Sequence, residues 1–280
     1  MPVLNIARMT FLEVWMRKVL WAAVLLGLAF LAVFATGLHF IYQEFTRNVG
    51  DSPASFLEPM NFFLMAGLYV VNFLVVMLAV LTSVDTISGE IASGTIDTIV
   101  SKPLRRWEIV VGKWLGLGVL MSAFALLMSG ALMLLVWLIA HYVPPNPVSG
   151  AGMIALEGLV VLTLSILCGT RLSTLVNGVV VFMLYGLAFV AGWVEQIGSY
   201  LHSEAAVNTG ILVSLVMPSE AMWKRAAYLM QPPFLRELGL DVTPFGAAAS
   251  APSSAMVLYA LLYLAVCLLI AIWSFNRRDL

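Results

Sequence analysis

Six long apolar stretches run through the sequence: 19–42, 60–82, 109–140, 152–169, 175–194 and 255–275. A bilayer core about 30 Å thick is crossed by about 20 apolar residues in a helix. Within that core every backbone polar group must be satisfied by the chain itself, which favours helices for spans of this length. The sequence therefore predicts an all-α, polytopic membrane protein with six transmembrane helices, forming one transmembrane domain over 1–280.

The composition agrees with this and excludes other classes. Hydrophobic residues make up 62% of the chain and charged residues 10%, with a mean hydropathy of +1.01. Soluble domains have about 45–50% apolar and about 25% charged residues. The formal net charge of −1 argues against a nucleic-acid partner, which would require a basic face.

The distribution of Lys and Arg predicts the orientation. Most of the 14 Lys and Arg residues lie near the termini and in the connections after the second and fourth stretches. Cytoplasmic connections carry such an excess under the positive-inside rule. Both termini are therefore expected in the cytoplasm, as an even number of spans also requires. We expect a multi-pass protein of a bacterial cytoplasmic (inner) membrane.

Three segments outside the six stretches carry patterns of their own. In residues 1–18, apolar side chains recur at helical spacing: Leu4, Ala7, Phe11 and Val14. This predicts an amphipathic helix on the inner membrane surface, and a cytoplasmic extension of the first span fits equally well. Residues 144–150 are expected to form a Pro-rich connection. Residues 195–252 are expected to form an extracytoplasmic region, with a helix at 219–230.

The connection after the second stretch, 83–106, is expected to be a cytoplasmic segment rich in charge. It begins with apolar residues at helical spacing: Val84, Ile87 and Ile91. Gly94 interrupts this helix, because Gly costs about 1 kcal/mol relative to Ala in a helix interior. Pro103 then suits the start of the next helix, from which Lys113 is expected to snorkel to the interface. The positive-inside rule explains the basic residues here, but not the acids among small residues, so docking to a partner is a second interpretation.

Several short motifs in and after this segment occur as a set: Gly89-Glu90, Ser93-Gly94-Thr95, Ser101-Lys102-Pro103, Arg106 and Gly112-Lys113. The set resembles the cytoplasmic signature of type-2 ABC exporter permeases. The resemblance extends to the six spans, the N-terminal helix, the large outer region and the chain end Arg277-Arg278-Asp279-Leu280, so it covers nearly the whole chain. It implies the type V permease fold. Among subgroups, the sequence looks most like the permease for maturation of nitrous-oxide reductase.

This resemblance implies the transmembrane permease subunit of an ATP-driven ABC transporter, an exporter, which is not itself an enzyme. The sequence has no G-x-x-x-x-G-K-[ST] loop, so ATP and Mg would bind a separate subunit and this chain would bind no cofactor. The implied assembly contains two ATP-binding subunits and a second permease copy, as a homodimer, surrounded by membrane lipids. A periplasmic partner protein could bind the outer region.

The resemblance also implies that 83–106 is a cytoplasmic coupling segment with docking residues, since in such transporters a short cytoplasmic helix fits a groove of the ATPase and transmits its closure. The candidates are Asp85, Ile87, Glu90, Ile91, Gly94 and Thr95. Arg105 and Arg106 would pair with acids of the ATPase or, equally well, with lipid phosphate. Arg171 marks a second inner loop that could be a smaller docking point.

Two polar residues within the apolar stretches are candidates for a transport pathway. Glu157 is expected about one and a half turns inside the outer end of the fourth stretch. A charge at mid-bilayer costs roughly 2.5–3.5 kcal/mol on insertion scales, so such residues often face a pathway. Asn72 is the second candidate, although a hydrogen bond between helices is the commoner role. No metal site is expected, because the histidines lack metal-ligand spacing.

Two other functions remain open from the residues alone. A secondary transporter would often contain inverted repeats and broken mid-membrane helices, which the sequence does not reveal. An intramembrane enzyme would need acids or histidines that converge within the membrane, and only Glu157 is expected there.

Overall fold

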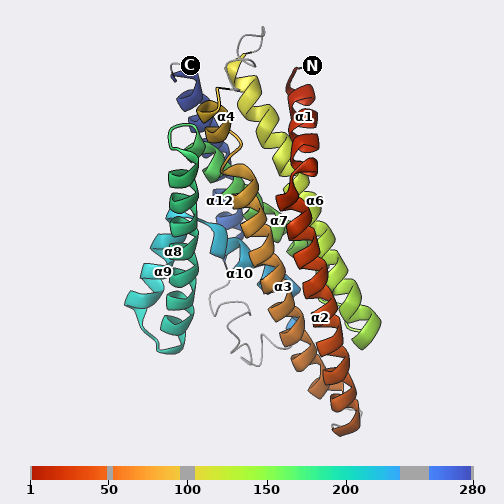
Figure 1. Cartoon of the computed structure of the whole chain (residues 1–280). Helices are drawn as coiled ribbons and strands as arrows, with labels where there is room; N and C mark the ends of the chain where they lie inside the picture. Colours follow the sequence, from red (N-terminus) through yellow and green to blue (C-terminus); the bar gives the residue numbers. More distant parts are fainter. Residues whose placement is uncertain (1, 49–52, 95–104, 234–251, 279–280) are drawn as a thin grey trace.

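The computed structural model describes residues 2–48, 53–94, 105–233 and 252–278. The regular elements in these ranges are all α-helices, as predicted. Figure 1 shows an elongated bundle in which the long helices run side by side, with both chain ends at the same end of the bundle.

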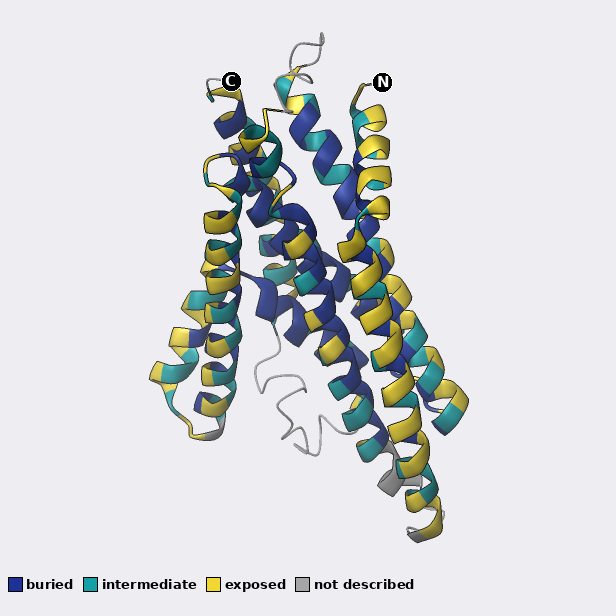
Figure 2. Cartoon of the chain, viewed as in Figure 1, coloured by how far each residue is buried: buried dark blue, intermediate teal, exposed yellow. Residues whose placement is uncertain are grey.

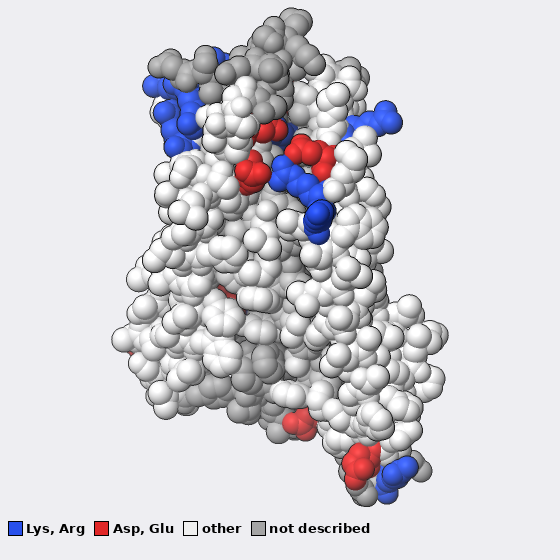
Figure 3. Space-filling model, in the orientation of Figure 1, with Lys and Arg blue, Asp and Glu red and all other residues white. Residues whose placement is uncertain are grey.

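Six helices in the described ranges are long and apolar enough to cross a membrane, which confirms the six predicted spans. They are α2 (Lys18–Asn48), α3 (Pro53–Ser83), α6 (Arg106–Ala140), α7 (Pro147–Gly169), α8 (Thr174–Tyr200) and α12 (Ser254–Asn276). On the face drawn in Figure 3, charged side chains gather toward the two ends and leave a band between them that is almost free of charge. A hydrocarbon core requires such a band.

The core of the bundle lies along α3 and α7, while α2 and α12 expose most of their side chains. Figure 2 shows this as a dark, buried interior with exposed residues along α2 and α8. The exposed side chains of these outer helices are largely leucine, valine and phenylalanine. Since lipid tails are as apolar as leucine, such faces suit a bilayer or another apolar helix.

The turn between α6 and α7 is shorter than the sequence predicted. α6 ends where His141 takes a left-handed backbone conformation with φ of 52°, and Asn146 takes one with φ of 46° just before α7. Pro147 then starts α7, a position where its missing N–H is not needed. The expectation that 147–150 belongs to the connection was wrong, and the earlier start of α7 places Glu157 deeper in its helix than predicted.

The N-terminal residues form a separate helix, α1 (Pro2–Met16), that is divided from α2 by a break at Arg17. α1 packs along α6, where a Cβ at Gly116 would lie 2.5 Å from the carbonyl oxygen of Ala7. The buried residues of this face are Thr10 and Val14. Of the predicted apolar stripe, Val14 is buried within the protein, whereas Leu4 is 60% exposed. Whether α1 lies on the membrane surface stays a prediction.

The close approach of α1 to α6 leads to a testable result. Gly116→Ala places its new Cβ against the backbone of α1, and overpacking of this kind typically costs about 1–3 kcal/mol. Gly130→Ala on the same helix meets nothing within 4 Å and is the matched control. We expect trypsin to cut after Arg8 faster in the Gly116 variant alone. Equal cleavage of both variants would show that α1 does not depend on this contact.

Between α8 and α12 the chain forms two further helices. α9 (Glu204–Val216) packs along α8, and α10 (Ser219–Met230) turns from α9 by 109°. α10 packs against α7, and Figure 1 shows it within the length of the bundle. The helix predicted at 219–230 is confirmed. However, α8 continues to Tyr200, so the outer region expected at 195–252 begins as part of a spanning helix.

Candidate functional site

The segment that follows α3 keeps its backbone folded by a series of hydroxyl groups. The side chains of Thr82, Ser83, Thr86 and Ser88 each donate a hydrogen bond to the carbonyl four residues earlier, at 2.6–2.7 Å. A turn over 84–87 leads into the short helix α4 (Ser88–Ala92). Gly94 then takes a left-handed conformation with φ of 70°, which Gly accepts without strain at a helix end. The predicted short helix and its break at Gly94 are therefore confirmed.

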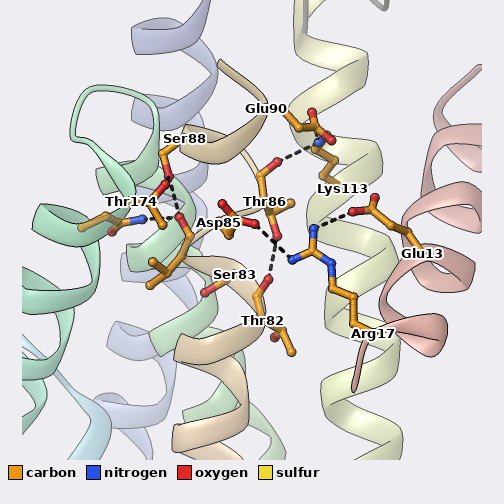
Figure 4. A network of polar contacts seen from close by, with 12 residues as sticks. Glu13, Arg17, Thr82, Ser83, Asp85, Thr86, Ser88, Glu90, Lys113 and Thr174 are labelled. Carbon is orange, nitrogen blue, oxygen red and sulfur yellow. Dashed lines mark hydrogen bonds and ion pairs between the residues drawn. The ribbon is translucent and has the colours of Figure 1, made fainter. Parts of the chain in front are cut away.

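A buried lysine attaches this segment to α6. Lys113 is 3% exposed, its ammonium forms an ion pair with the carboxylate of Glu90, and it donates a hydrogen bond of 2.7 Å to the carbonyl of Thr86. Figure 4 shows Lys113 reaching from α6 to both partners. The expectation that Lys113 snorkels to the interface was wrong, because its buried ammonium pairs with the Glu90 carboxylate of α4 inside the protein.

A second ion pair attaches the same segment to the N-terminal helix. Arg17, at the break between α1 and α2, pairs with Glu13 at 2.6 Å and with Asp85 at 3.4 Å. Figure 4 shows the Arg17 guanidinium between these two carboxylates. The Asp85 side chain is half exposed, so this contact is weaker than that of Lys113.

The other side of the segment contacts α8. The hydroxyl groups of Ser88 and Thr174 lie 3.0 Å apart, and the amide of Asn177 donates to the carbonyls of Val84 and Ser165 at 3.2 and 3.0 Å. Asn177 of α8 thus forms hydrogen bonds both to the segment after α3 and to α7. Residues 84–94 therefore form a structured end of the bundle, held by α1, α6 and α8 together. We call residues 84–94 the coupling segment, after the role that is proposed for them below.

The arginines near the coupling segment contact the end of α12. Arg106 donates to the carbonyl of Arg278 at 2.6 Å, and Arg171 donates to the hydroxyl of Ser274 at 2.8 Å. Basic side chains stabilise the carbonyls at a helix C-terminus, which is where these two arginines lie. Arg105 instead caps the start of α6, with its backbone N–H donating to the carboxylate of Glu108.

The structure therefore divides the predicted docking residues. Asp85, Ile87, Glu90, Ile91 and Gly94 lie together in the coupling segment, while Thr95 lies outside the described residues. Ile87 is only 2% exposed and Glu90 is paired within the chain. Neither therefore presents a free surface to a partner in this arrangement.

Sequence reasoning missed the residues that hold the coupling segment: Glu13, Arg17, Thr86 and Lys113. Lys113 carried a usable signal, since a cation two turns inside an apolar helix commonly needs a buried partner. Arg17 and Glu13 carried a weaker one, because four-residue spacing predicts only their own ion pair. The contact of Arg17 with Asp85, 68 residues away in the sequence, depends on the tertiary fold.

Comparison with families of known proteins matches residues 4–280 to the family described as ABC-2 family transporter protein. The chain belongs to this family. It is a membrane permease of an ABC-2 type transporter, a non-catalytic transmembrane subunit. No match to a curated protein was found. Family membership decides among the functions that the residues left open, in favour of the permease over a secondary transporter or an intramembrane enzyme.

The coupling segment of this ABC-2 permease ends in an exposed tip. Its last residues, Ala92, Ser93 and Gly94, are exposed, whereas residues 86–88 are buried. We call residues 92–94 the tip. The tip is exposed, whereas the earlier residues of the coupling segment are held by helices of the bundle.

Proposed function

We propose that the coupling segment transmits movement between a separate ATP-binding subunit and the spanning helices of this permease. The observation that carries the proposal is the buried ion pair of Glu90 with Lys113, which is completed by the hydrogen bond from Lys113 to Thr86. Through it, a displacement of α4 acts directly on α6, one of the spanning helices. Arg17 extends the same link to α1 through Asp85.

In this proposal the exposed tip, and not the acids before it, contacts the ATP-binding subunit. Glu90 and Ile87 serve as the internal attachment of the coupling segment, since one is paired and the other buried. Residues 92–94 and the residues that follow them are the proposed contact. Arg106 and Arg171, which hold the end of α12, are proposed as supports of the neighbouring surface.

The tip is tested by adding a large charged side chain there. We expect Ala92→Arg to prevent co-purification of the ATP-binding subunit, because the tip has to fit closely against it. Ala205→Arg, at an equally exposed alanine in the first turn of α9, is the matched control and should leave the complex intact. Both variants should fold, since neither position is buried. Loss of the complex in both, or in neither, would contradict docking through the tip.

The remaining assembly follows from the same proposal. ATP and Mg bind the partner subunit, two copies of which act on a homodimer of this permease in a bacterial inner membrane. The basic end of the bundle, which carries the coupling segment, faces the cytoplasm and so do both termini. The apolar faces of α2, α8 and α12 are available to lipid and to the second copy. The sequence resemblance supports three further parts of the proposal. They are export as the direction of transport, membership of the nitrous-oxide-reductase maturation subgroup, and a periplasmic partner for the outer region.

A further inference from the structure

Glu157 occupies the middle of a spanning helix. It lies ten residues after Pro147, the first residue of α7, which places it ~15 Å along the helix axis. That distance is about half of the ~30 Å hydrocarbon core. Its side chain is completely buried. Placing an ionisable group at this depth of the membrane costs free energy, so such a residue usually has a function. Its neighbours indicate which function that is.

Among the described residues, no hydrogen bond of normal geometry reaches this carboxyl group. Both carboxyl oxygens of Glu157 and the amide oxygen of Asn72 lack a hydrogen-bond partner among the described residues. Asn72 is 2% exposed and faces Glu157 from α3, near enough to act on the carboxyl group. A buried polar group usually has a partner, so two adjacent groups with unused acceptors point to a ligand that donates hydrogen bonds or carries positive charge.

The buried charged groups near Glu157 also favour a positively charged ligand. α10 and α8 contribute two further buried acids, Glu220 and Glu195, but a single buried cation, Lys224. Lys224 pairs with Glu195 at 2.7 Å and also acts on Glu220. Glu220 in turn acts electrostatically on Glu157. The single ammonium thus serves Glu195 and Glu220, and a positively charged ligand would supply the cation that Glu157 lacks among the described residues.

Aromatic rings lie beside these acids. Tyr69 is one turn before Asn72 on α3, so the two share a face. Its ring packs edge-on against Trp223 of α10, with ring centroids 5.0 Å apart, and stacks on Phe189 of α8. Tyr185 continues this group along α8, and both tyrosines are within electrostatic reach of Glu157 and Glu220. Electron-rich ring faces next to carboxylates are the chemistry that recognises organic ammonium groups.

We propose that Glu157, with Asn72, Glu220 and the Tyr69–Trp223 pair, binds a positively charged organic group of the transported molecule, an alkylated ammonium. A metal ion fits less well, because the described residues contain no group of three or more His, Cys, Asp or Glu side chains placed to hold one. The inference rests on the proposed transport function, and it assigns the cargo to the class of organic cations.

The test is equilibrium binding of tritiated benzyltrimethylammonium to the full chain in lipid nanodiscs. We expect saturable binding to the unmodified chain, weakened roughly tenfold or more by Glu157→Gln. Glu58→Gln, at an exposed glutamate of α3, is the matched control and should bind as the unmodified chain does. Tyr69→Leu should weaken binding more than Tyr69→Phe, which keeps the ring.

Competition on the unmodified chain supplies a second readout that depends on no variant. Unlabelled tetramethylammonium should displace the probe, whereas neopentylbenzene, the uncharged carbon isostere of the probe, should not. Absence of saturable binding, equal binding by the Glu157→Gln chain, or equal competition by the uncharged isostere would each overturn the proposal. The last result would show an apolar site with no use for the carboxyl group.

The experiment separates this inference from the coupling proposal. Binding is measured without an ATP-binding subunit, so it can succeed even if the tip at residues 92–94 contacts no such subunit. Conversely, a chain that assembles with an ATP-binding subunit through its tip but does not bind the ammonium probe would refute only the cargo class.

Discussion

Replacing Lys113 with methionine is expected to destabilise the chain by about 3 kcal/mol, the lower end of the cost of breaking a buried ion pair. The change leaves the Glu90 carboxylate, whose side chain is 18% exposed, without its cation. It also removes the donor to the carbonyl of Thr86. The lower end applies because Glu90 retains some access to water. Since α4 would lose its link to α6, we also expect ATP hydrolysis in the complex to become uncoupled from transport.

The two free cysteines of the chain provide the measurement. Cys267 is buried and Cys168 is half-buried, so a thiol-reactive fluorophore reports thermal unfolding. Glu90→Gln combined with Lys113→Met should recover part of the loss, because no unpaired charge remains. Lys18→Met, at an exposed lysine near the same end, is the matched control and should change little. If Lys113→Met unfolded at the same temperature as this control, the ion pair would not hold the coupling segment.

The second large effect is expected at the buried pair of Lys224 and Glu195, whose side chains are 4% and 8% exposed. Lys224→Met should cost about 3–5 kcal/mol, because it leaves Glu195 and the neighbouring Glu220 without a buried cation. Glu195→Gln should cost less, since Lys224 still faces Glu220. This asymmetry between the two partners is the expected signature of two acids, Glu195 and Glu220, sharing one ammonium.

The same fluorophore assay measures the asymmetry, with the Lys18→Met chain again as reference. Because α10 is attached to α8 through this pair, trypsin should also reach Arg225 in the Lys224→Met chain at temperatures where the unmodified chain resists. Equal destabilisation by the two substitutions would mean that Lys224 interacts with Glu195 alone.

The spans could be predicted from the sequence because hydropathy and helix length are local properties. The ends of the spans were harder to predict from the sequence. The start of α7 at Pro147 lies in a segment whose prolines favour a connection, and the continuation of α8 to Tyr200 passes Glu195. Glu195 is stabilised there by an ion pair with the buried Lys224 of α10. Because the two residues are 29 positions apart, no local sequence pattern reveals this pair.

The coupling segment shows the same division. Its short helix and the break at Gly94 followed from spacing and from the conformational freedom of Gly. The roles of its residues did not, because exposure was inferred from charge. Glu90 looked like a surface acid, and only the fold places Lys113 against it. Likewise Arg106 and Arg171 looked like partner or lipid contacts, although both hold the end of α12.

The central claim, that the tip of the coupling segment contacts an ATP-binding subunit, is tested most directly by photo-crosslinking in the assembled transporter. A benzophenone amino acid at position 92 is predicted to crosslink to the ATP-binding subunit, while the same group at position 205 is predicted to crosslink to lipid or to this chain. Crosslinks from position 92 to lipid alone, in a complex that still hydrolyses ATP, would contradict the account.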